Sequence, residues 1–200
     1  MRNRLGLCGL LMVALILVSA CRHKEDPNEV AVLDTSYGQI VIEFLPADAP
    51  KNVANFKNLV RDHFYDGTRF HRIVKIENRI VAVQGGDPNT INGDPGTWGM
   101  GQPGQKRVPG EFSKTLRHVA GTVSMARTAN DPDSATSQFF ICTAPNPQWD
   151  GQYSIFGRVI QGMNVVEAIS RAPVARNSNT PLDPVVVKSV RLAKRNEIGL

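Results

Sequence analysis

Short runs of β-forming apolar residues, separated by turns rich in glycine and proline, recur along most of the sequence. Only residues 48–62 and 162–170 space their apolar residues as an amphipathic helix does. In the first of these, Asp48 is expected to cap the helix and Pro50 to occupy its first turn. Many short strands with two helices predict an antiparallel β-sandwich or β-barrel. The strand-like runs lie at 30–44, 70–86, 121–127, 137–143, 153–160 and 184–193.

The N-terminus has the composition of a secretory signal peptide. Arg2 and Arg4 precede a mostly apolar run over residues 5–18, and small residues follow it. That run is shorter than the roughly 20 apolar residues that a stable membrane-spanning helix needs. The sequence therefore predicts a removed signal peptide over residues 1–20 and an exported mature protein.

The end of this segment, "LVSAC", resembles a bacterial lipobox, in which the cysteine becomes the lipid-modified first residue of the mature protein. Cys21 is then the lipidation site, and residues 21–29 form a polar tether. The alternative is an ordinary signal peptide that is cut near Ser19 or Ala20. The lipid anchor predicts a protein of the cell envelope, held at a membrane and facing the periplasm or the exterior.

Charge and cysteine content argue against nucleic-acid binding and against an intramolecular disulfide. The formal charge of +5 falls to +3 when Arg2 and Arg4 are removed, and no long basic run is present, so nucleic-acid binding is not expected. Cys8 lies in the signal segment, so Cys142 has no partner for an intramolecular disulfide in the lipidated chain. We expect Cys142 to be a small buried residue and the protein to be a monomer.

Several familiar motifs fail on context. Residues 99–104, "GMGQPG", match the glycine pattern of dinucleotide-binding loops, but Pro103 interrupts them and neither a preceding strand nor a following helix is predicted. This segment is expected to be a flexible surface loop. The four histidines show no metal-ligand spacing and no G-x-S-x-G elbow occurs, so neither a metal site nor a serine hydrolase is predicted.

Isolated polar residues inside apolar strands are the remaining signal. They are Arg72 in "FHRIV", Gln84 in "VAVQGGD" and Gln138 in "SQFFI". Together with "GTVSMAR" and "FGRVIQGMNVVEAI", these motifs resemble the cyclophilin-type peptidyl-prolyl isomerases in order and rough spacing, from Val30 to about Leu192. The resemblance implies a mainly β fold, a closed eight-stranded antiparallel β-barrel capped by two α-helices. The isomerase domain is expected at 30–193, followed by a charged tail at 194–200.

The resemblance also implies a chemistry without a cofactor. Rotation about an X–Pro bond is slow because the twisted amide loses resonance, at a barrier of about 18–20 kcal/mol. In the twisted state the prolyl nitrogen regains a lone pair, which a permanently charged donor stabilises. Arg72 is then the catalytic residue, and Gln84 binds a substrate carbonyl.

Other positions follow from the same resemblance as substrate-binding residues. Phe140 lines the proline pocket, and Tyr153 lies beside it. Ala126 and Arg127 form the strand edge that pairs with the substrate backbone, where the main chain of Arg127 matters more than its side chain. His71 supports the strand next to the catalytic arginine.

The sequence departs from the family pattern at the pocket. Val81 and Ala82 replace a phenylalanine and a methionine, so the pocket is expected to be wider or shallower. Gln148 takes the place of an aromatic residue, and Trp149 follows it where an aliphatic residue is common. The segment that joins the two catalytic strands is longer than usual by an even number of residues, which preserves the alternation of faces.

Three functions remain in competition on the sequence alone. The leading prediction is a peptidyl-prolyl cis-trans isomerase that acts on proline-containing exported polypeptides and assists their folding. The alternative is a chaperone module that binds proline segments with low turnover, which the small Val81 and Ala82 favour. A structural β-barrel of the envelope without any pocket is the third.

Overall fold

Eight antiparallel strands form one curved sheet in the computed structural model, which describes residues 26–176 and 178–200. The signal peptide, Cys21 and most of the tether lie outside the described residues. The strands are β1 (Glu29–Thr35), β2 (Gly38–Phe44), β3 (Arg72–Ile76), β4 (Arg79–Gly85), β5 (Thr122–Met125), β6 (Phe139–Cys142), β7 (Ile155–Gln161) and β8 (Val187–Lys194). Their order in the sheet is β3-β4-β6-β5-β7-β2-β1-β8.

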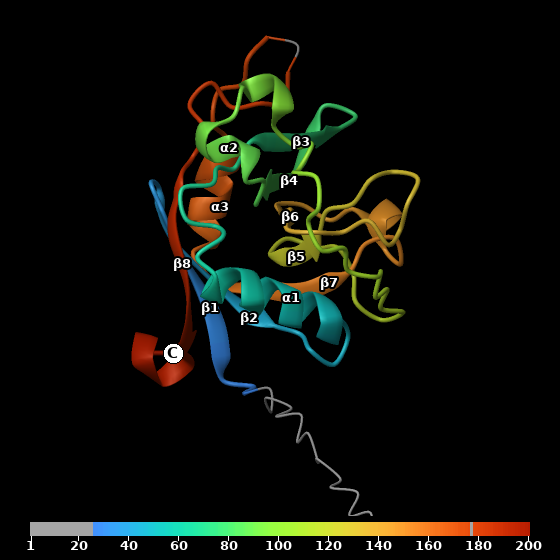
Figure 1. Cartoon of the computed structure of the whole chain (residues 1–200), viewed down its shortest axis with the longest axis vertical. Helices are drawn as coiled ribbons and strands as arrows, with labels where there is room; N and C mark the ends of the chain where they lie inside the picture. The colour runs from blue at the N-terminus through green and yellow to red at the C-terminus, as the bar shows by residue number, and fades with distance from the viewer. Residues whose placement is uncertain (1–25, 177) are drawn as a thin grey trace, which may run out of the picture.

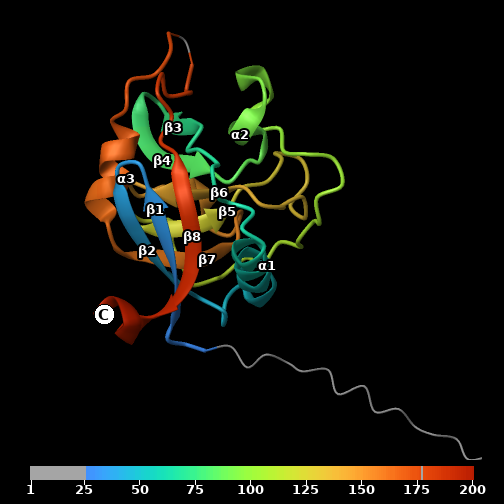
Figure 2. The ribbon, with the colours of Figure 1, turned by 60° about the vertical axis from the view of Figure 1, so that its left-hand side comes forward.

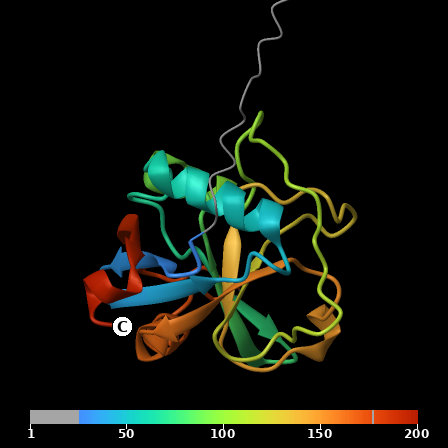
Figure 3. The ribbon, with the colours of Figure 1, turned by 90° about the horizontal axis from the view of Figure 1, so that it is seen from below.

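Two helices of several turns pack against this sheet, as the sequence predicts. In Figure 2 the strands lie between α3 and α1, and Figure 3 shows α1 lying across one end of the curved sheet. A third helix, one turn long, and three 3-10 turns were not predicted. The helices are α1 (Pro50–Arg61), α2 (Asn89–Asn92) and α3 (Met163–Ser170), and the 3-10 turns are η1 (Pro95–Thr97), η2 (Pro147–Trp149) and η3 (Arg195–Ile198).

The prediction of a closed barrel is wrong, because β3 and β8 at the two ends of the sheet do not form a ladder. They are linked through an isolated bridge between Arg69 and Val186. The free edge of β3 is instead met by a loop, where Ile73 N donates to Asn179 O at 2.8 Å. Pro184, which precedes β8, has no N–H to continue a ladder. The result is an open half-barrel.

The start of α1 also differs from the prediction. Asp48 does not cap the helix, and the residue at the N-cap, Ala49, makes no side-chain hydrogen bond. The carboxylate of Glu111 instead accepts hydrogen bonds from Lys51 N and Asn52 N, each at about 3.0 Å. A distant acidic residue thus satisfies the free amide groups of the first turn.

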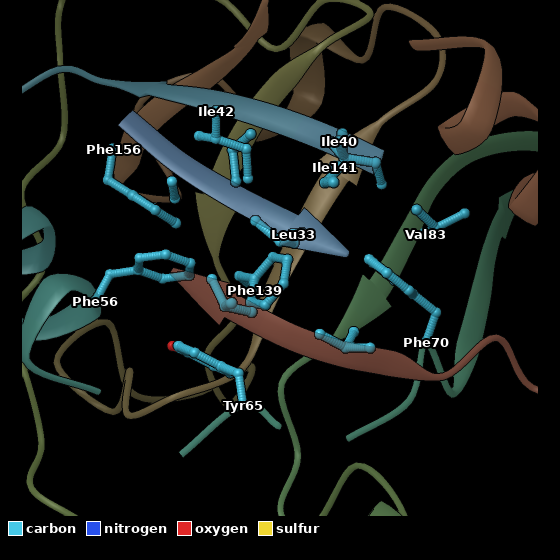
Figure 4. Packing of buried hydrophobic residues seen from close by; sticks show 14 of the residues in the cluster. Leu33, Ile40, Ile42, Phe56, Tyr65, Phe70, Val83, Phe139, Ile141 and Phe156 are labelled. Carbon is cyan, nitrogen blue, oxygen red and sulfur yellow. The ribbon is translucent and has the colours of Figure 1, made fainter. Parts of the chain in front are cut away.

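The interior of the half-barrel is an aromatic and aliphatic core. Phe56 of α1 packs against Phe139 of β6 and Phe156 of β7, with ring centroids 5.6 Å and 5.1 Å apart (Figure 4). Tyr65 stacks on Phe56 and donates its hydroxyl to Ser137 O at 3.0 Å. This core fixes the inner face of β6 and so positions the residues of its outer face, Phe140 and Cys142.

No helix among residues 26–176 and 178–200 combines the length and the apolar character needed to cross a bilayer.

Gly162, the N-cap residue of α3, gives a test of how closely the start of α3 packs against β2. It has φ +89°, and a Cβ there would lie 2.1 Å from Gln39 O of β2. Gly151→Ala is a matched control, because Gly151 has φ +70° with no atom within 4 Å of its Cβ position. We expect Gly162→Ala to lower the free energy of unfolding by at least about 3 kcal/mol in urea titrations, and Gly151→Ala by about 1 kcal/mol. Equal losses would show that α3 does not pack on β2 as described.

Candidate active site

Arg72 and Gln84 stand opposite each other across the β3–β4 hairpin. Residues Glu77 and Asn78 form its tight turn, with φ of 48° and 64° as a two-residue hairpin of this kind requires. The Arg72 guanidinium donates a long hydrogen bond of 3.4 Å from Nη1 to Gln84 Oε1. The longer hairpin brings these two side chains together as predicted, but the expected unbroken alternation of faces is wrong, because a register shift between Val74 and Lys75 interrupts the ladder.

A chain of amide groups extends from this pair. Gln84 Nε2 donates to Gln138 Oε1 at 2.9 Å, and Gln138 Nε2 donates to Gly99 O at 3.0 Å. Gln138 is noted in the sequence as a polar residue in an apolar strand, yet no role was assigned to it. The pattern that singles out Arg72 and Gln84 singles it out too. Coupled hydrogen bonds of this kind restrict each side chain to one orientation.

The loop that follows β4 is held in place by Asp87. Its carboxylate accepts hydrogen bonds from the amides of Gly99, Gly101 and Asn89, the last two at 3.3 Å and 3.0 Å. Gly99 and Gly101 have φ of 87° and 70°, which glycine adopts readily. The segment 99–104 is a mostly exposed loop beside Arg72, as predicted, and Asp87 ties it down at Gly99 and Gly101.

A cavity of about 270 Å³ opens between this loop and the chain that follows β5. Gln84 and Arg72 contribute to one side of it, and Ala126 and Arg127 to the other. The remaining lining residues are mostly small or polar. They are Gly99, Met100, Gly101, Gln102, Gln105, Thr128, Ser134, Thr136 and Gln138.

Ala126 and Arg127 continue the line of β5 beyond its last ladder residue. The Ala126 amide donates to Gln138 O at 2.9 Å. The Arg127 side chain is already occupied, since Nε donates to Gln152 O at 2.9 Å and the guanidinium lies 4.7 Å from the centroid of the Tyr153 ring. This is consistent with a main-chain rather than a side-chain role for Arg127.

An aromatic cluster lies on the outer face of the sheet beside the same strands. The Phe140 ring contacts Trp149 at 4.9 Å and Tyr153 at 5.4 Å between centroids, so Trp149 turns toward the predicted pocket. Phe140 is only 4% exposed, and Val81 and Ala82 are fully buried in the same cluster. These two residues therefore pack within the aromatic cluster and line neither its surface nor the 270 Å³ cavity.

Gln148, in contrast, is exposed on η2 and lines neither the 270 Å³ cavity nor the aromatic cluster. The structure does not bring it to the other predicted residues.

A buried histidine supports Phe140 from behind. His118 stacks on the ring at 6.0 Å, and its nitrogens lie 3.0 Å from Asp150 Oδ1 and 3.1 Å from Ser124 Oγ. This resembles a hydrolase triad, but Ser124 is fully buried and cannot meet a substrate. Burial lowers the pKa of His118, although the hydrogen bond with Asp150 opposes the shift, so the ring is neutral at pH 7.

Two further kinds of chemistry would require a nucleophilic cysteine or a metal site. Burial raises the pKa of the Cys142 thiol to about 12, so this cysteine is not a nucleophile. No three His, Cys, Asp or Glu side chains within the described part of the chain gather as metal ligands would.

His71 precedes Arg72 and is fixed by its main chain, whose N–H donates to Gln84 O at 3.0 Å. Its ring is buried, which fits the expected support of the strand, and burial lowers its pKa. Of the predicted residues in the described chain, Arg72, Gln84, Ala126 and Arg127 line the 270 Å³ cavity, and His71 lies next to Arg72 outside it. The others except Gln148 form the adjoining aromatic cluster.

Comparison with known proteins agrees with this arrangement. The family described as cyclophilin type peptidyl-prolyl cis-trans isomerase/CLD matches residues 30–192. A peptidyl-prolyl cis-trans isomerase of Acinetobacter baylyi is 36% identical over 84% of this chain and 88% of its own length. The isomerase ppi1 of Schizosaccharomyces pombe is 38% identical over 80% of this chain and 97% of its own.

A solved structure leads to the same family. The cyclophilin-type isomerase of Cryptosporidium parvum, crystallised in the presence of the dipeptide Ala-Pro, superimposes with a TM-score of 0.72 at 28% identity. The match covers 82% of this chain and 99% of that one. Sequence, fold and the ordered motifs around Arg72 and Gln84 together show that the chain belongs to the cyclophilin-type peptidyl-prolyl cis-trans isomerase family.

Proposed function

We propose that the protein is a peptidyl-prolyl cis-trans isomerase that acts on exported polypeptides and assists their folding, from a lipid anchor on Cys21. The observation that carries the proposal is the Arg72 guanidinium, paired with Gln84 at the wall of an open cleft and beside the Phe140 cluster. Family membership supports the activity, and the "LVSAC" segment supports the anchor.

The proposed mechanism is electrostatic stabilisation of a twisted amide. Arg72 donates to the prolyl nitrogen, whose lone pair is available only in the twisted state, so the interaction favours the transition state over both planar isomers. An amide nitrogen carries two donors, and Gln84 Nε2 uses one on Gln138, which leaves the second for a substrate carbonyl. The main chain at Ala126 and Arg127 aligns the substrate.

The proline ring is placed against the Phe140 cluster. Trp149 and Tyr153 flank Phe140 and supply an apolar wall in the region where the sequence lacks the usual phenylalanine and methionine. Phe140 is only slightly exposed, which favours the alternative function, a module that binds proline segments with low turnover. Turnover measurements separate the two functions.

The start of the described chain and the site lie at different ends of the domain. The described chain begins at Asp26, at the end of β1 that is remote from β3 and α2 (Figures 1 and 2). An anchor at Cys21 would therefore leave the cleft facing away from the membrane, open to polypeptides in the periplasm or at the cell exterior. We propose a monomer, because one chain supplies every residue of the site.

Replacement of Arg72 is the first test. Arg72 is exposed, so Arg72→Ala should leave the unfolding midpoint almost unchanged. Loss of the charged donor should lower kcat/KM by about 100-fold or more in a protease-coupled assay on an X–Pro peptide. Arg72→Lys is the matched control, and it should recover little activity because a point charge lacks the planar fork of arginine. Peptide binding without any acceleration by the wild type would support the binding module instead.

The pH profile is the second test. No proton is transferred and arginine stays charged, and because burial lowers the pKa of both His71 and His118 below 6.5, both rings are already mainly neutral at pH 6.5 and do not titrate above it. We expect kcat/KM to vary by less than about twofold between pH 6.5 and pH 8.5. A bell-shaped profile in this range would contradict the mechanism, because it would reveal an essential acid or base.

Localisation is tested at the proposed lipidation site. In cells that process lipoproteins, the wild type should fractionate with membranes, whereas Cys21→Ser should move to the soluble fraction or keep its signal peptide. Cys142→Ser controls for the loss of a thiol and should stay with the membranes. If Cys21→Ser matures and stays membrane-bound as the wild type does, the lipid anchor is wrong.

A further inference from the structure

A second cavity, of about 360 Å³, shares part of its wall with the substrate cleft. Arg72 and Gln84 line both, so a polypeptide bound at the catalytic arginine lies at the mouth of each. The volume falls in the range of ligand-binding pockets and is ample for one side chain. The other residues around the second cavity are His71, Trp98, Gly99, Met100, Asn179 and Thr180.

His71 is the feature of this cavity that structure alone leaves unexplained. It is 3% exposed, and the Arg69 main chain is the one polar group that acts on its ring by hydrogen bonding, so at least one ring nitrogen has no hydrogen-bond partner among residues 26–176 and 178–200. Its Nε2 lies under the loop, 3.6 Å from where a Cβ on Gly99 would be. Buried polar groups are nearly always paired, so an imidazole nitrogen without a partner, at the wall of a cavity, points to a polar group that enters the cavity.

The walls around His71 are fixed by contacts of their own. The Trp98 indole donates from Nε1 to Gly93 O at 3.2 Å, and the Arg69 guanidinium lies 5.9 Å from its ring. On the facing side, Asn179 O accepts from Ile73 N at 2.8 Å, which ties this loop to β3. The cavity is therefore part of the folded domain and does not depend on a ligand to form it.

The polar groups of the cavity favour a negatively charged ligand. Arg72 supplies a positive charge, and none of its lining residues is acidic. Asp87 acts on His71 electrostatically, but its carboxylate is engaged by the Gly99 and Gly101 amides. The side chains of His71, Asn179 and Thr180 add neutral donors, and carboxylate oxygens are strong acceptors for such groups.

We propose that this second cavity binds the carboxylate of an aspartate or glutamate that lies within a few residues of the substrate proline. The inference rests on the proposed isomerase function and deepens it, because it names the class of proline segment that the enzyme prefers. His71 and Asn179 hold the carboxylate in the cavity, and Arg72 attracts it while its guanidinium faces the prolyl bond. The preference is electrostatic and weakens as salt is raised.

A peptide series tests the preference. X–Pro peptides carry Glu, Gln, Ala or Lys in turn at each position within three residues on either side of the proline, and kcat/KM is measured by exchange NMR at low salt. At one position we expect Glu to exceed Lys by roughly tenfold, with Gln and Ala between them, and the ratio to shrink in concentrated NaCl. Equal values at every position overturn the inference and leave the isomerase activity standing.

Variants locate the effect. His71→Phe and Asn179→Leu should each bring the Glu-to-Lys ratio close to one, whereas Asn164→Leu, on the exposed side of α3, should keep the wild-type ratio. Asn179→Leu carries the test if His71→Phe does not fold. An undiminished ratio in Asn179→Leu overturns the assignment to this cavity. Failure of the wild type to accelerate any peptide is a different result, since it overturns the proposed function itself.

Discussion

The antiparallel register of β3 and β4 is the constraint on which the site depends. It sets Arg72 opposite Gln84, and a slip of one residue would turn one of the two side chains to the other face of the hairpin. Ladder hydrogen bonds on both sides of β4 hold this register, because β6 pairs with the other edge and places Phe140 opposite Gln84. One strand thus joins the Arg72 guanidinium, the Gln84 amide and the Phe140 ring.

The polar network turns this register into a defined orientation of the arginine. Gln84 contacts both Arg72 and Gln138, and Gln138 reaches the loop at Gly99, so segments far apart in the sequence are fixed to one another. Asp87 holds the loop through its amide groups. Stabilisation of a twisted amide requires donors that are oriented before the substrate arrives, and such a network would orient the Arg72 guanidinium in advance.

Much of this was readable from the sequence, because strands alternate faces and the ordered motifs carry the family likeness. Arg72 and Gln84 stood out as polar residues in apolar strands, the role of Phe140 followed from the family resemblance, and the two longer helices followed from their spacing. The open edge of the sheet could not be predicted in this way, because it depends on a hydrogen bond between β3 and a loop more than one hundred residues later in the sequence. The cap of α1 by Glu111, and the part played by Gln138, likewise arise from contacts that no local pattern encodes.

Catalysis by one preorganised unit is the central claim, and a double-mutant cycle between Arg72 and Gln84 tests it most directly. The rate of cis-trans exchange of an X–Pro peptide is measured by NMR for the wild type, Arg72→Ala, Gln84→Ala and the double variant. Because Gln84 both orients the guanidinium and binds a substrate carbonyl in the proposed mechanism, the two losses should be coupled, and the double variant should be several-fold faster than the product of the two single losses predicts. If the two single losses multiply in the double variant, the residues act independently and the account of a single catalytic unit is contradicted.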